Sequence, residues 1–108
     1  MIRTVLILAL LAVLLAGCSN TNTCGGVTKK EAIAAARDGI ALQANVEGTA
    51  VPKTIVADVK KSYDEKAKHD AWWVVLEYKS GYLSGSPVCF FVGKDSEVGL
   101  EVHTRPCS

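Results

Sequence analysis

The spacing of apolar and polar residues divides the chain into segments with different structural expectations. Residues 4–16 form an apolar run, with Arg3 before it and no further charge until Lys29. The run is about 13 residues long, short of the ~20 that a transmembrane helix needs to cross the hydrocarbon core. A positive residue followed by a short apolar run is typical of a cleaved targeting segment rather than of a permanent span.

A helix is predicted to begin at Thr28. Thr28 and Glu31 have the spacing of a capping box, in which each side chain accepts a hydrogen bond from the other residue's backbone amide. The alanine-rich segment that follows is strongly helix-forming. Gly39 offers one end for this helix, and Gly48 offers a later one. We favour the longer helix, with Pro52 beyond its end.

From Thr54 the apolar residues recur with a period of two, which predicts β-strands. Strands are expected at 54–60, 71–79, 88–92 and 98–103, and the short connections make them antiparallel neighbours. If residue 92 pairs with residue 98, one continuous apolar face results. We therefore predict an α+β fold, with one N-terminal helix packed on a four-stranded antiparallel meander. The predicted helix-facing residues are Ile55, Ala57, Val59, Trp72, Val74, Leu76, Tyr78, Val88, Phe90, Val92, Val98, Leu100 and Val102.

The same register sends Trp73, Val75 and Phe91 to the opposite face, alongside Val56. Exposed apolar patches mark interaction sites, and aromatic residues dominate binding energies, so these three residues are predicted to bind a partner. Charged residues at the rim are expected to be Glu77, Lys79, Glu101 and His103. The alternative is that the tether, the loop 80–87 or an extended helix covers this face.

The end of the apolar run, Leu15-Ala16-Gly17-Cys18, resembles the lipobox of bacterial lipoproteins. The resemblance implies cleavage before Cys18, diacylglycerol on its thiol and a further acyl chain, often palmitate, on the new amino group. Two or three chains make attachment to a bilayer effectively permanent. The alternatives are an ordinary secretory signal or an uncleaved anchor. By family analogy, Ser19 favours the outer membrane over the inner one in a host with two membranes.

This resemblance divides the chain into a signal peptide at 1–17, a lipidated N-terminus with a flexible tether at 18–27, and a small domain at 28–108. The stretch from Ser19 to Gly26 is polar or glycine-rich and is expected to bury no apolar surface. Fully extended, such a tether reaches about 30 Å, which keeps the domain near the bilayer on the periplasmic or exterior side.

A second resemblance is to the PepSY and cystatin-like small domains. It rests on Thr28-Lys-Lys-Glu-Ala-Ile-Ala-Ala-Ala, on Trp73-Val-Val-Leu-Glu-Tyr and on Val92-Gly-Lys-Asp-Ser-Glu-Val. The glycine usual in the last turn of the PepSY pattern is replaced by Ser96. The resemblance implies binding, peptidase inhibition or an accessory role, and it carries over no catalytic residues.

The charge balance argues against polyanionic partners. The chain has 12 basic and 11 acidic residues, and the only basic residue before Cys18 is Arg3. The remainder is therefore formally neutral and has no broad field to attract nucleic acid.

Cysteine use points to an oxidising compartment. If Cys18 carries lipid, Cys24, Cys89 and Cys107 remain, and one disulfide would stabilise a small domain by ~3 kcal/mol. Cys89 and Cys107 lie at the same end of the predicted last hairpin, so we favour their pairing, with Cys24 buried or paired between chains. Pairings of Cys24 with either partner stay open.

An enzymatic reading has less support. It would use Cys24 or His103 in thiol-redox or other chemistry, but the chain has no Cys-x-x-Cys pair and no histidine beside Cys24. His69 and His103 lack metal-ligand spacing and are expected to be solvated, so neither a metal nor a cofactor is predicted. The sequence thus favours a non-enzymatic, membrane-tethered binding or accessory module of the cell envelope.

Overall fold

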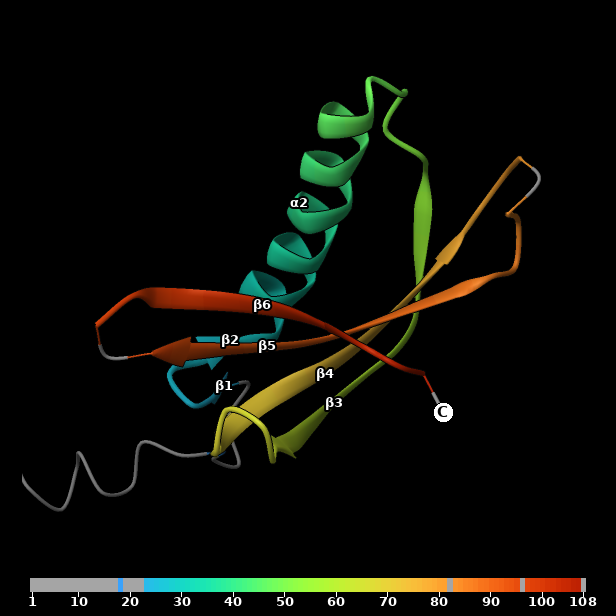
Figure 1. The fold of residues 1–108 in the computed structure, drawn as a ribbon. Coiled ribbons are helices and arrows are strands. Elements are labelled where there is room, and N and C mark those ends of the chain that lie inside the picture. The colour runs from blue at the N-terminus through green and yellow to red at the C-terminus, as the bar shows by residue number, and fades with distance from the viewer. Residues whose placement is uncertain (1–17, 19–22, 82, 96, 108) are drawn as a thin grey trace, which may run out of the picture.

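The computed structural model describes residues 18, 23–81, 83–95 and 97–107, so the predicted signal peptide lies outside the described residues. A two-stranded sheet, β1 (Thr23–Cys24) with β2 (Val27–Thr28), precedes the helix α2 (Lys29–Glu47). The main antiparallel sheet follows in the order β3 (Thr54–Asp64), β4 (His69–Tyr78), β5 (Pro87–Asp95) and β6 (Gly99–Arg105). The helix lies on one face of this sheet (Figure 1). The predicted fold, one helix on a four-stranded meander, is confirmed.

Both ends of α2 follow from local sequence. Thr28 Oγ1 accepts from the Glu31 amide at 3.1 Å, and Glu31 Oε1 accepts from the Thr28 amide at 3.1 Å. The hydrogen bond from the Thr28 backbone lowers the pKa of Glu31. Gly48 ends the helix in the left-handed conformation, with φ 72° and its N–H donated to Ala44 and Asn45. The longer helix is therefore confirmed.

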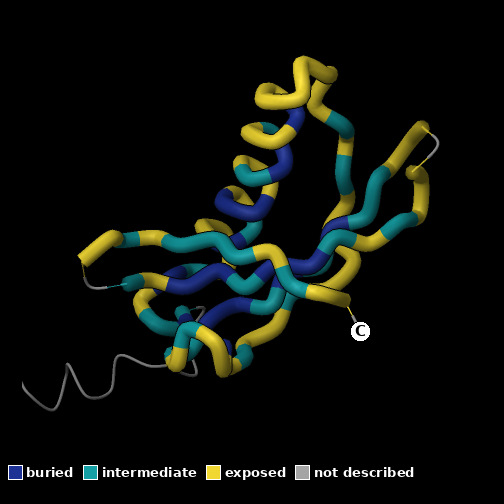
Figure 2. Tube along the Cα trace, viewed as in Figure 1, coloured by how far each residue is buried: buried dark blue, intermediate teal, exposed yellow. Residues whose placement is uncertain are grey.

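The core lies between small helix residues and large sheet residues (Figure 2). Ala32 and Ala36 let the helix backbone approach the sheet closely, and Trp72 closes the core beside the small sheet by donating its indole N–H to the Val27 carbonyl at 2.7 Å. The buried apolar residues are Cys24, Val27, Ala32, Ala35, Ala36, Ile40, Trp72, Val74, Leu76, Phe90 and Val92.

The predicted tether was wrong for residues 23–27. These residues form the β1–β2 hairpin, and the side chains of Cys24 and Val27 are buried in the core. Gly25 makes the turn possible: its φ is 60°, and a Cβ there would lie 2.7 Å from the Asp70 carbonyl oxygen. Two apolar side chains in a mostly polar segment were enough to dock it, a contact that composition does not predict.

The predicted register of the last hairpin was also wrong. Val92 pairs with Val102, not with residue 98, and Val98 is an exposed residue of the connecting turn. Asp95 shapes this turn, because its carboxylate accepts from the Glu97 amide at 2.7 Å and from the Val98 amide at 3.0 Å. The bonds from Val98 and Glu97 lower the pKa of Asp95. The observed register differs from the predicted one by an even number of residues. The side chains of β6 therefore lie on the sides of the sheet that were predicted.

An irregularity in β3 exchanges two predicted faces. Val56 pairs with Leu76 and Asp58 pairs with Val75, so Ala57 is an extra residue in the ladder. Val56 therefore shares the helix-facing side with Leu76, whereas Ile55 pairs with Glu77 on the opposite side. The prediction had these two residues the other way round, because a strict period of two cannot register a bulge.

Two disulfides join the cysteines. Cys89 and Cys107 are bonded, with their Cα atoms 5.3 Å apart, which is the pairing favoured from the sequence. Cys18 is bonded to Cys24. Cys24 is therefore not an unpaired thiol in this structure. The prediction of an unpaired cysteine assumed that Cys18 carries lipid and forms no disulfide. Among the described residues, no helix is both long enough and apolar enough to cross a membrane.

A buried and an exposed leucine should respond differently to the same substitution. Leu76→Ala should lower the free energy of unfolding by about 2–5 kcal/mol, because Leu76 is fully buried under the helix. Leu42→Ala removes the same atoms from a side chain that is 66% exposed and should change it by less than ~0.5 kcal/mol. Urea denaturation followed by tryptophan fluorescence measures both, and equal losses would contradict the assigned core.

Candidate functional site

The face of the main sheet opposite the helix holds a groove of about 560 Å³, which we call the outer groove. The end of β3, the middle of β4 and β5, and the C-terminal tail all contribute to it. In Figure 1 the last part of β6 crosses in front of β4 and leads toward β3. The lining residues are Lys60, Ser62, Tyr63, Asp64, Glu65, Lys66, Trp73, Phe91, Arg105, Pro106 and Cys107.

Two of the three predicted binding residues meet in this groove. Trp73 on β4 and Phe91 on β5 are register partners, and their ring centroids lie 4.9 Å apart with the planes tilted by 59°. This is a favourable geometry for an aromatic pair. Both side chains are half-buried, so part of each is open to a partner. Val75 is not among the lining residues; it pairs with Cys89 instead.

An ion pair ties the two sides of the groove together. Arg105 Nη2 lies 3.2 Å from Asp64 Oδ2, which joins the end of β6 to the β3–β4 hairpin. Asp64 is 1% exposed, and its other oxygen accepts from the backbone amides of Lys66 and Ala67 at 3.1 and 3.4 Å. These three bonds give both oxygens of the buried carboxylate a partner, as a charge in this position requires.

The Cys89–Cys107 disulfide holds the C-terminal tail against the same face. Cys89 lies on β5 two residues before Phe91, and Cys107 lines the outer groove. The bond therefore fixes one wall of the groove and restricts the motion of the C-terminal tail. Sequence reasoning favoured this disulfide but did not foresee that it would shape the predicted binding face.

A cluster of two histidines and a glutamate adjoins the groove. Glu101 Oε2 lies 3.1 Å from His103 Nε2 and 4.0 Å from His69 Nε2. The His69 ring covers Gly93, where a Cβ would collide with it, and His69 Nδ1 lies 3.0 Å from the Asp70 carbonyl oxygen. Both histidines keep part of their side chains exposed, at 26% for His69 and 37% for His103. Sequence analysis did not foresee that strand pairing brings these β4 and β6 residues together around Glu101.

The outer groove offers aromatic, charged and hydrogen-bonding side chains that can contact a partner. No group of three or more histidine, cysteine or acidic side chains among the described residues could hold a metal ion. Cys24 is buried and bonded to Cys18, and His103 contacts Glu101, so no described contact joins the two residues of the enzymatic alternative. Of the predicted rim, Glu101 and His103 lie beside Phe91, whereas Glu77 lies at the other end of β4 and Lys79 follows it.

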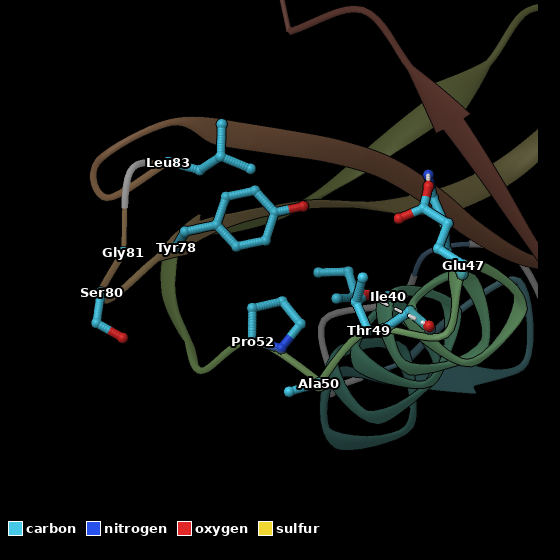
Figure 3. A pocket seen from close by; sticks show the side chains of 11 residues that line it. Ile40, Glu47, Thr49, Ala50, Pro52, Tyr78, Ser80, Gly81 and Leu83 are labelled. Carbon is cyan, nitrogen blue, oxygen red and sulfur yellow. Dashed lines mark hydrogen bonds between the residues drawn. The ribbon is translucent and has the colours of Figure 1, made fainter.

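A second, smaller hollow of about 250 Å³ lies where the end of α2 faces the β4–β5 loop. Figure 3 shows Tyr78 and Leu83 on one side of it, with Ile40, Thr49 and Pro52 on the other. Its lining is mostly apolar, and sequence analysis did not predict it. Periodicity alone cannot reveal it, because the hollow forms where the end of α2 meets Tyr78 and loop residues that lie far from α2 in the sequence.

Comparison with family models, with curated proteins and with solved structures finds no match for this chain.

The ion pair yields a stability prediction. Asp64→Asn keeps an acceptor for the two backbone amides but removes the charge opposite Arg105, so it should lower the free energy of unfolding by about 1–3 kcal/mol. The neighbouring Glu65→Gln removes an exposed charge that forms no ion pair among the described residues and should change it by less than ~0.5 kcal/mol. Denaturant titration of both variants measures the two changes. Equal stability of the Asp64→Asn and Glu65→Gln proteins would show that the Asp64–Arg105 ion pair does not stabilise the fold.

Proposed function

We propose that this chain is a membrane-anchored bacterial lipoprotein whose small domain is a non-enzymatic binding or accessory module of the cell envelope. The observation that carries the binding role is the half-buried Trp73–Phe91 pair on the floor of the outer groove. Aromatic residues that remain partly exposed inside a concave site supply much of the energy of protein recognition.

The groove favours a partner with an apolar or aromatic group and nearby acidic groups. Lys60 and Lys66 line it and form no ion pair with any described residue, while Asp64 and Arg105 neutralise each other. Glu65 also lines the groove, so the lining keeps a small excess of positive charge. The Tyr63 hydroxyl and the Ser62 side chain add hydrogen-bonding capacity. Because the disulfide and the ion pair already fix the walls, binding would lose little conformational entropy.

The anchoring role rests on the lipobox and Cys18. Cys18 Sγ lies 3.9 Å from the carbonyl oxygen of Ser62, a residue of the outer groove. That position belongs to the form in which Cys18 is bonded to Cys24, and acyl chains on Cys18 would replace this disulfide. Because Cys24 is buried in the core only six residues after Cys18, the acyl chains would still hold the domain close to the bilayer. A partner of the groove would then be an envelope component close to the bilayer surface. We place the module on the periplasmic or exterior side, with the outer membrane favoured by Ser19.

One cysteine sulfur cannot form both a lipid thioether and a disulfide. A thioether to diacylglycerol and a disulfide to Cys24 both use Cys18 Sγ, so lipidation excludes the Cys18–Cys24 disulfide. In the lipidated protein, Cys24 would be a thiol buried in the core, with its Sγ 3.2 Å from the Ala71 carbonyl oxygen. A buried thiol in apolar surroundings is unreactive, which supports a structural rather than a redox role. A peptidase-inhibitory role of the PepSY-like kind falls within the binding proposal.

The groove is tested with Trp73→Ala. This variant should lose capture of envelope partners in proximity labelling from the lipidated protein in its host, because it removes half of the aromatic floor. Val98→Ala, at a 74% exposed position outside the groove, should label the wild-type set. Urea denaturation must show Trp73→Ala folded; an unfolded variant would identify Trp73 as a core residue and remove the binding proposal.

The anchor is tested with Cys18→Ala. This variant should leave the membrane fraction or be misrouted, because it lacks the sulfur that carries the lipid. In the wild-type protein, alkylation under denaturing but non-reducing conditions should modify one cysteine, Cys24, and mass spectrometry should find acyl chains on Cys18. Unchanged fractionation of the variant, with no lipid mass on the wild-type N-terminus, would overturn the anchor.

A further inference from the structure

A third hollow, of about 350 Å³, lies where the middle of α2 meets the start of β3, and it carries positive charge only. Arg37, Lys53 and Lys79 line it together with the apolar residues Ile40, Val51 and Pro52. No acidic residue lines it. We call it the basic hollow. It is separate from the outer groove, with which it shares no residue.

Two contacts hold the three cations near one another although they belong to three different segments. Arg37 on the helix donates from Nε to Thr54 Oγ1 at 3.4 Å and from Nη2 to the Thr54 carbonyl at 3.5 Å. The Lys79 amide donates to the Lys53 carbonyl at 2.9 Å, which brings these two lysines to the same end of the β3–β4 pair. These contacts of the folded chain therefore bring the three cationic residues to the same part of the surface.

This arrangement is electrostatically unfavourable in the isolated chain. None of the three cations forms an ion pair with any described residue. Like charges held close together repel one another, and the chain after Cys18 is formally neutral as a whole, so acidic residues are present elsewhere but do not line this hollow. An anion in the hollow would turn this repulsion into attraction, with the guanidinium of Arg37 suited to a carboxylate.

The apolar part of the hollow limits the kind of anion. Val51 is 52% exposed between the cations, and Ile40 and Pro52 also line the hollow of Figure 3, which continues toward Tyr78 and Leu83. A free inorganic ion would leave this apolar surface in water. An apolar centre with a charged rim is the usual composition of a protein interface, and two adjoining hollows fit a chain better than one compact ligand.

We propose that the basic hollow binds an acidic segment of a partner polypeptide, in which carboxylates alternate with apolar side chains. The carboxylates lie against Arg37, Lys53 and Lys79, and an apolar side chain packs on Val51 and Pro52. This contact is independent of the outer groove, so the domain has two separate binding surfaces.

The test uses the full-length protein in phosphatidylcholine nanodiscs, with empty nanodiscs as the blank. The probe is a fluorescein-labelled peptide of alternating glutamate and leucine, and the matched peptide has glutamine for each glutamate. Fluorescence anisotropy should give a Kd at least about tenfold lower for the glutamate peptide. Binding should weaken as NaCl rises from 20 to 200 mM, because the Debye length falls from about 20 Å to about 7 Å.

A triple variant, Arg37→Gln with Lys53→Gln and Lys79→Gln, should raise this Kd about tenfold. A control of equal charge change, Lys29→Gln with Lys30→Gln and Lys94→Gln, should stay within about twofold of the wild-type Kd. Trp73→Ala should also bind the peptide normally, which separates this site from the outer groove. Equal binding of both peptides, equal losses in the two triple variants, or full displacement of the peptide by decanoate would overturn the proposal.

Discussion

A single helix can cover only one face of a four-stranded sheet, and the rest of this molecule follows from that constraint. The helix brings small residues to the sheet, so the helix-facing side supplies the core, with Trp72, Val74 and Phe90 as its large members. Within the part of the chain that the structure describes, no second layer of secondary structure covers the other face. That face is closed in part by the ends of the chain's own strands, through the Asp64–Arg105 pair and the Cys89–Cys107 disulfide. A small domain has too little core to leave such a face unsupported, and the same supports leave a groove between them.

Local chemistry made the fold predictable where it acts over short distances. The Thr28–Glu31 capping box set the start of the helix, and the period of two set the strands and most of their faces. The predictions failed where a distant contact decides the outcome. The β1–β2 hairpin is ordered by docking Cys24 and Val27 in the core, and the bulge at Ala57 exchanges Val56 with Ile55 without any signal in the pattern.

The candidate site shows the same division. Strand alternation was sufficient to send Trp73 and Phe91 to one face, and the register of β4 with β5 then pairs them. It could not reveal the walls of the groove, because Asp64 and Arg105 are 41 residues apart and lie in segments that read as a polar turn and a strand end. The clustering of His69 with Glu101 likewise depends on the absence of a side chain at Gly93. Such pairs form when the folded chain brings distant residues together, and the spacing of residues along the sequence does not predict them.

The bulge in β3 has a further consequence for how copies of this chain behave together. β3 and β6 are the outer strands of the main sheet, and outer strands offer unpaired backbone groups to which another copy can add. The extra residue at Ala57 interrupts the straight ladder of β3, and Lys60 and Lys61 place charge along the same strand. Confinement to a membrane surface would raise the rate at which such edges meet. A bent, lysine-bearing edge lets many copies crowd together without joining into a continuous sheet.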